Sequence, residues 1–175
     1  MQYRVIIILL GLISLGYQGV AGPFDLVPMP ASVVKGEGSF SVDRATVIRH
    51  DAALAQEAAM AARMLEPVLG YALRTEVAGA TSETGVIRLQ LNQPNDRLTG
   101  TEGYLLKITP QKVLISANTA AGVFYGIQTL WQMAGESPRA LPAAVISDYP
   151  RFPYRGVHVD VVRHFMPFES LFPLI

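Results

Sequence analysis

Short strand-like runs alternate with two long helical runs, and this alternation constrains the fold more than any other feature of the sequence. The strand-like runs are rich in β-branched residues or alternate apolar with polar residues, as half-buried strands do: 45–49, 73–77, 86–91, 104–109 and 112–116. The helical runs have apolar residues at three- and four-residue spacing. The sequence therefore predicts an α+β fold in which a sheet of mostly antiparallel strands is covered by two helices.

Each helical run has recognisable end signals. Asp51 and Asn118 precede the two runs and are expected to act as helix N-caps. The first helix should end near Pro67 and Gly70, because proline lacks a backbone donor and glycine readily adopts left-handed backbone. In the second helix one apolar stripe should cover the sheet, and the tryptophan beside it is interpreted as part of the same core: Val123, Ile127, Leu130 and Trp131.

Proline and glycine indicate the turns and linkers. Two prolines make residues 24–30 an extended lead-in to a turn at 36–38. The last two strand-like runs, joined by a short polar turn, are expected to form an antiparallel hairpin. After Gly135 prolines recur, and the chain is interpreted as a linker with one short apolar stretch, 143–146.

The first 22 residues have the parts of a secretory signal peptide. A short positive start is followed by an apolar run over 5–15 and by small residues at 19–22. A membrane span needs about 20 apolar residues, whereas polar and small residues from Gly16 onward interrupt this run. We therefore expect cleavage near Ala21 or Gly22, no stable membrane span afterwards, and a protein that is secreted or periplasmic.

Composition narrows the kind of partner and site. The chain has 14 basic and 14 acidic residues, so an uncharged partner is expected and nucleic acid is not. The absence of cysteine excludes disulfides, thiolate metal sites and a cysteine nucleophile. His158, Asp160 and His164 are not interpreted as a metal site, because no cluster of Glu or Cys completes a coordination sphere, and no cofactor is predicted. Four glycines lack the spacing of a phosphate-binding loop and are interpreted as turn and close-packing positions: Gly100, Gly103, Gly122 and Gly126.

A long motif covers residues 148–165. A proline- and aromatic-rich stretch leads into the pair Arg155-Gly156, a valine-rich strand that ends in Asp160, and the triplet Arg163-His164-Phe165. This motif resembles the entry into the catalytic (β/α)8 barrel of glycoside hydrolase family 20. Upstream segments resemble the N-terminal accessory domain of the same family, in the same order: 26–30, 36–40, 102–108 and 120–130.

The resemblance divides the chain into three parts. We expect a signal peptide (1–22), an accessory domain (23–147), and a linker with the first strand of an incomplete (β/α)8 barrel (148–175). The valine-rich run from Gly156 to Val162 is the expected barrel strand, because strands buried on both faces are rich in valine.

The resemblance also implies an activity. Family 20 enzymes are β-N-acetylhexosaminidases, which remove terminal non-reducing N-acetylhexosamine from glycans or chitin oligosaccharides. The acetamido oxygen of the substrate attacks the anomeric carbon, while an adjacent Asp–Glu pair orients that group and supplies the general acid/base. These 175 residues contain no adjacent Asp–Glu pair. Catalytic residues are therefore expected to be absent, and the chain alone is expected to be inactive.

One residue of this chain is expected to bind the substrate. Arg155 matches the family arginine that holds hydroxyls of the terminal sugar, a task suited to a guanidinium with several directed donors. Asp160 and His164 could orient groups of the sugar pocket from behind. Asp160 could equally pair with Arg163 at the end of the strand.

Other interpretations stay open. The chain could be a non-catalytic module that binds a glycan or another partner, or an inactive truncated gene product. Families with similar accessory domains, such as α-glucuronidases and family 84 hexosaminidases, form a third possibility, against which the triplet at 163–165 favours family 20. An Asp–Glu pair encoded beyond Ile175 would separate the enzyme from the binding module.

Overall fold

A computed structural model describes residues 24–79, 83–96 and 100–156, together with the single positions 158, 160, 163, 167 and 169. The predicted signal peptide lies outside the described residues, as do 157, 159, 161 and 162 of the predicted barrel strand. Ten elements occur in chain order in the described part: β1 (Ser32–Ser41), β2 (Val47–His50), the 3-10 helix η1 (Ala52–Leu54), α2 (Ala55–Leu69), β3 (Arg74–Val77), β4 (Val86–Leu91), β5 (Tyr104–Ile108), β6 (Lys112–Ala117), α3 (Ala120–Glu136) and β7 (Ala140–Asp148).

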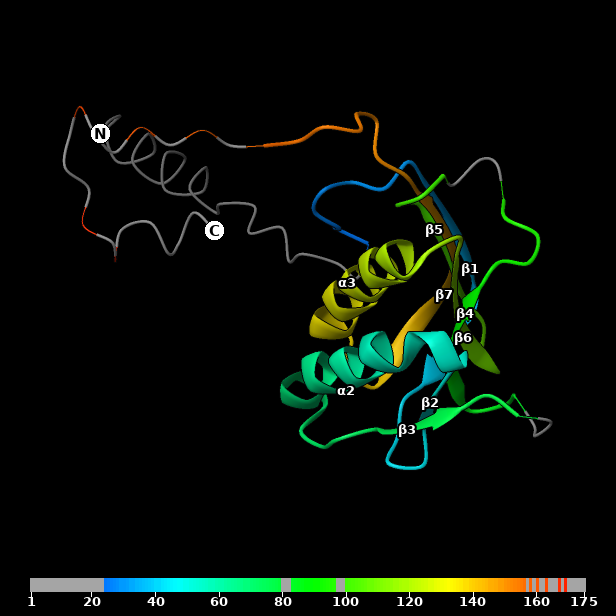
Figure 1. The fold of residues 1–175 in the computed structure, drawn as a ribbon. Coiled ribbons are helices and arrows are strands. Elements are labelled where there is room, and N and C mark those ends of the chain that lie inside the picture. Colours follow the sequence, from blue (N-terminus) through cyan, green and yellow to red (C-terminus); the bar gives the residue numbers. More distant parts are fainter. Residues whose placement is uncertain are drawn as a thin grey trace, which may run out of the picture.

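A seven-stranded sheet with the order β1-β7-β5-β6-β4-β2-β3 forms one layer. The helices α2 and α3 lie side by side against one face of it and form the second layer (Figure 1). The core lies between the layers and contains the predicted stripe Val123, Ile127 and Leu130. The predicted α+β fold with two helices is therefore confirmed.

The pairing of the strands is mixed. The predicted hairpin is present as the antiparallel pair β5–β6, and β7 pairs antiparallel with both β5 and β1. The pairs β4–β6, β2–β4 and β2–β3 are parallel. Parallel neighbours require a crossover connection, and α2 provides it between β2 and β3. Half of the pairings among the described strands are thus parallel, where the sequence suggested mostly antiparallel ones.

The stretch after α3 is a strand inside the sheet and not a loose linker. β7 lies between β1 and β5. Its Pro142 pairs only with Ser39 of β1, beyond the residues 144–148 that pair with β5, so the missing N–H interrupts no ladder to β5. The predicted turn at 36–38 is instead an irregularity within β1, where the register shifts between Lys35 and Ser39.

Both predicted N-caps have other partners. Thr119 caps α3 by accepting a hydrogen bond from the N–H of Gly122 at 3.3 Å. Asn118 instead binds the loop before β5, since its amide donates to the carbonyl oxygens of Asp96 and Gly100. Helix α2 runs through Pro67 and ends at Gly70, whose φ is +78°.

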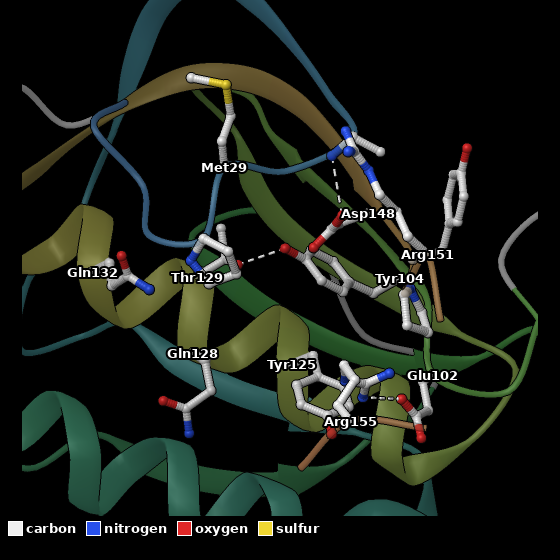
Figure 2. A pocket seen from close by; sticks show the side chains of 14 residues that line it. Met29, Glu102, Tyr104, Tyr125, Gln128, Thr129, Gln132, Asp148, Arg151 and Arg155 are labelled. Atoms are coloured by element: carbon white, nitrogen blue, oxygen red, sulfur yellow. Dashed lines mark hydrogen bonds and ion pairs between the residues drawn. The ribbon is translucent and has the colours of Figure 1, made fainter. Parts of the chain in front are cut away.

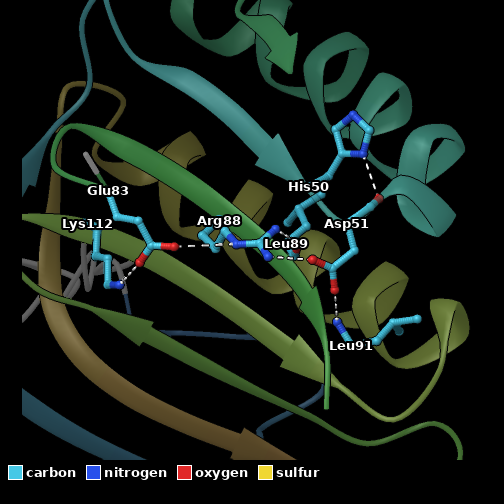
Figure 3. A network of polar contacts seen from close by, with 7 residues as sticks. All are labelled: His50, Asp51, Glu83, Arg88, Leu89, Leu91 and Lys112. Carbon is cyan, nitrogen blue, oxygen red and sulfur yellow. Dashed lines mark hydrogen bonds and ion pairs between the residues drawn. The ribbon is translucent and has the colours of Figure 1, made fainter. Parts of the chain in front are cut away.

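Asp51 belongs to a chain of charges on the sheet (Figure 3). Its carboxylate pairs with Arg88, which is 9% exposed, and accepts the N–H of Leu91 at 2.8 Å. Nε of Arg88 lies 3.7 Å from Glu83, which in turn pairs with Lys112. The hydrogen bond from Lys112 lowers the pKa of the Glu83 carboxyl below its ordinary value. The carboxylates of Asp51 and Glu83 thus compensate the charge of the buried guanidinium. Because Arg88 and Leu91 engage its carboxylate, Asp51 makes no side-chain capping hydrogen bond, although it occupies the N-cap position of η1.

Trp131 does not belong to the core. The residue is 39% exposed, although Leu130 beside it is buried. Successive helix positions are separated by about 100° of rotation, so the side chain next to a buried one can face solvent. The prediction of a buried tryptophan was wrong.

Candidate functional site

A cavity of about 510 Å³ lies where β5 begins and β7 ends. The antiparallel register sets Tyr104 opposite Asp148 and so places both residues at this edge of the sheet. Four segments supply the lining: the lead-in (Pro28, Met29, Ala31), the start of β5 with the loop before it (Glu102, Tyr104), one face of α3 (Tyr125, Gln128, Thr129, Gln132), and the end of β7 with the residues after it (Asp148, Tyr149, Pro150, Arg151, Arg155). Figure 2 shows these side chains around the cavity.

Arg155 lies in this cavity and is held by named partners. Its Nη2 donates to Oε2 of Glu102 at 2.5 Å (Figure 2). Its Nη1 donates to the carbonyl oxygen of Phe152 at 2.8 Å. The hydrogen bond to Glu102 raises the pKa of the Arg155 guanidinium above its ordinary value, and Tyr125 adds to this effect. The guanidinium is therefore a fixed cation in the cavity wall.

Tyr104 brings a buried phenol to the cavity. The residue is 2% exposed, and its hydroxyl lies 2.5 Å from Oγ1 of Thr129 on α3. Burial raises the pKa of Tyr104 to about 12, and the nearby carboxylate of Asp148 acts in the same direction. Asp148 also accepts the N–H of Ala31 at 3.0 Å. The phenol is thus a neutral hydrogen-bonding group at neutral pH.

The lead-in segment is fastened to α3. Nε2 of Gln132 donates to the carbonyl oxygen of Val27, and Oε1 of Gln132 accepts a hydrogen bond from the N–H of Val27, both at 2.9 Å. This double contact fixes the wall formed by Pro28 and Met29. The cavity lining therefore combines charged groups of both signs with a phenol, the Gln128 side chain and apolar faces. Such a set can hydrogen-bond an uncharged polar ligand such as a sugar.

Asp160, another predicted site residue, is not among the described residues that line this cavity. Asp160 pairs with Arg163, with Oδ2 at 2.7 Å from Nε and Oδ1 accepting the backbone N–H at 3.3 Å. This contact is the alternative that the sequence left open for Asp160. His164 lies outside the described residues, so its role stays a prediction. Within the described ranges no group of three His, Asp or Glu residues could hold a metal ion.

Several lining residues were not identified from the sequence. Glu102 and Tyr125 lie in segments that resemble the family, yet nothing local to either residue indicates a contact with Arg155. Glu102 and Arg155 are 53 positions apart, and only the folded sheet brings them together. Among the described residues, no helix is long and apolar enough to cross a membrane.

Comparisons with known proteins identify the class of protein to which this fold and cavity belong. The sequence model of "Glycosyl hydrolase family 20, domain 2" matches residues 24–149. Curated relatives include a β-N-acetylhexosaminidase of Cellulomonas fimi, 32% identical over 158 residues, which cover 86% of this chain and 31% of that protein. A β-hexosaminidase of Porphyromonas gingivalis is 30% identical over 158 residues, which cover 84% of this chain and 20% of that protein.

A solved structure agrees with these relatives. A mutant Streptomyces plicatus β-hexosaminidase in complex with its product GlcNAc matches with a TM-score of 0.65 and 31% identity over 88% of this chain and 32% of that one. The chain therefore belongs to glycosyl hydrolase family 20, whose matched members are glycosidases. It spans between a fifth and a third of the length of these three relatives.

Proposed function

We propose that this chain supplies the accessory domain and one sugar-holding residue, Arg155, of a glycosidase that removes terminal β-linked N-acetylhexosamine. The single observation that carries the proposal is the guanidinium of Arg155, which lines the cavity and pairs with Glu102. The proposal adds the resemblance of the motif at 148–165, in which Arg155 stands for the sugar-holding arginine of the family. The Streptomyces plicatus relative, 31% identical, holds GlcNAc as its product. The same class of amino sugar is therefore the proposed substrate here.

The chemistry of the proposed reaction needs groups beyond these 175 residues. Substrate-assisted cleavage requires a carboxylate to orient the acetamido group and an acid to protonate the leaving oxygen. The sequence has no adjacent Asp–Glu pair, and the cavity carboxylates Glu102 and Asp148 already accept hydrogen bonds from Arg155 and Ala31. Binding contacts without an acid/base leave the chemical step unassisted. We therefore propose that the 175-residue chain alone does not hydrolyse glycosides.

The setting of the protein is part of the proposal. The first 22 residues provide a positive start, an apolar run and small residues at the expected cleavage point, which support export to the periplasm or the medium. Export would place Arg155 where extracellular glycans or chitin oligosaccharides occur.

The test is a hydrolysis assay on two polypeptides. One is the protein translated from the complete reading frame that contains this sequence, and the other is the 175-residue chain. With 4-nitrophenyl N-acetyl-β-D-glucosaminide and the matching galactosaminide, the complete protein should release 4-nitrophenol and the 175-residue chain should not. A folded complete protein that cleaves neither substrate would contradict the glycosidase and favour a binding module.

A further inference from the structure

The loop that carries Glu102 is fixed by the first turns of α3. The hydroxyl of Thr119 donates to the carbonyl oxygen of Thr101 at 2.5 Å. The carbonyl oxygen of Gly103 lies so close to Gly122 that a Cβ there would be 2.4 Å from it. One side of Glu102 is thus hydrogen-bonded to the helix, and the other side packs against a position where only glycine fits. The backbone of Glu102 is therefore held in place independently of Arg155.

Arg155 follows a segment that lacks regular structure. Residues 149–156 form no helix or strand, and the side chain of Arg155 is 47% exposed. A long, half-exposed side chain on such a segment would otherwise sample several rotamers. Glu102 and the carbonyl oxygen of Phe152 take one N–H from each terminal nitrogen of the guanidinium. Since a guanidinium has five N–H donors, these contacts fix its plane and leave other donors available.

We propose that Glu102 is a positioning residue, which holds the guanidinium of Arg155 in the orientation from which its remaining N–H groups bind hydroxyls of the terminal amino sugar. The inference rests on the proposed function and adds a role for the accessory domain in substrate binding. Tyr125, on the same α3 that fixes the Glu102 loop, lies beside Arg155 in the cavity and supports it from a second side (Figure 2).

An ion pair that positions a substrate-binding group and one that only stabilises the fold differ in what their loss changes. Half-exposed pairs contribute little to the free energy of unfolding, and Glu102 is 33% exposed at its side chain. Its loss should therefore leave the fold intact. If the pair orients a substrate-binding group, the same loss should instead appear in substrate binding, because small displacements of a positioned group are costly.

The test compares Glu102→Gln and Glu102→Asp with the control Glu37→Gln in the protein translated from the complete reading frame. Glu37 is exposed on the edge strand β1, outside the cavity lining. For the aryl N-acetyl-β-D-glucosaminide we expect Glu102→Gln to raise KM about tenfold, with a smaller change in kcat. Glu102→Asp keeps the charge on a shorter side chain and should give an intermediate KM, while Glu37→Gln should match wild type.

A second measurement separates this inference from the proposed function. NMR spectra of the guanidinium N–H groups in the 175-residue chain should contain slowly exchanging signals from Arg155, which Glu102→Gln removes and Glu37→Gln preserves. Signals unaffected by Glu102→Gln would overturn the inference, as would an unchanged KM in an active complete protein. If the wild-type complete protein cleaves no aryl glycoside, the proposed function fails and the positioning role falls with it, while the NMR result still reports the ion pair.

Discussion

Tyr104 is the least exposed of the ionisable residues that line the cavity. Its hydroxyl contacts Thr129, and burial favours the neutral phenol over the phenolate. The folded-state pKa of about 12 lies above the ordinary value of 10.0. The contribution of this group to stability is therefore fully present below pH 10 and is lost as the pH rises towards 12.

The loss of this stabilisation above pH 10 predicts how Tyr104→Phe changes unfolding at alkaline pH. Between pH 10 and 12 the free energy of unfolding of wild type should fall by about 2–3 kcal/mol more than that of Tyr104→Phe, which has no group to titrate. Urea unfolding of the 175-residue chain across this range measures the difference. Tyr154→Phe, at a residue that is 88% exposed, is the matched control and should follow wild type. Parallel curves for wild type and Tyr104→Phe would contradict the account.

Individual residues were predictable where a motif was long and not where a distant partner decided. The motif at 148–165 singled out Arg155, which lines the cavity, while its role in holding the sugar stays a prediction. Asp51 and Asn118 had the right chemistry for helix caps, but partners outside their helices engage both side chains. A local pattern cannot indicate such contacts, because they depend on strand order.

Among the elements, α3 is the one that joins the sheet to the cavity. Its Gly122 lies against the carbonyl oxygen of Gly103 and the Cβ of Ala117, and its Gly126 lies against Ile115 and Tyr104. These contacts agree with the interpretation of both glycines as close-packing positions. The helix can approach the sheet only because these two positions carry no side chain.

Substitution of two glycines in α3 separates packing from helix propensity. Gly122→Ala should lower the free energy of unfolding by about 1–3 kcal/mol, because its Cβ would lie 2.4 Å from a backbone oxygen. Gly135→Ala has nothing within 4 Å and should raise it by about 0.5–1 kcal/mol. Urea unfolding at neutral pH measures both. Equal effects of the two substitutions would contradict the close approach of α3 to the sheet. If Gly122→Ala alone fails to fold, the predicted destabilisation is present in its most severe form.

Periodicity predicted most helices and strands correctly, whereas the positions of prolines led to one strand being missed. Both helices and the strands β2 to β6 were expected from their patterns. The strand β7 was missed because prolines surround it, although Pro142 lies where only the irregular edge strand β1 is paired. A proline excludes a strand only where a ladder needs its N–H, and that position cannot be known before the strand order is.

At the scale of the whole molecule, the sequence specified the class of fold and the family, and the structure added the site. Two layers around one core follow from the alternating patterns. The parallel half of the sheet did not follow, because parallel pairing depends on crossovers between distant segments. The predicted boundaries at 22 and 147, and the predicted export, stay predictions.

The proposed enzyme depends on one cation of this chain, the Arg155 guanidinium. Arg155→Lys in the protein translated from the complete reading frame tests that claim most directly, because lysine keeps the charge and loses the fork of directed donors. Arg74→Lys, 72% exposed at its side chain on the edge strand β3, is the control. The account predicts that Arg155→Lys lowers kcat/KM for the aryl N-acetyl-β-D-glucosaminide about a hundredfold while Arg74→Lys leaves it unchanged. Equal activity of the two variants would contradict it.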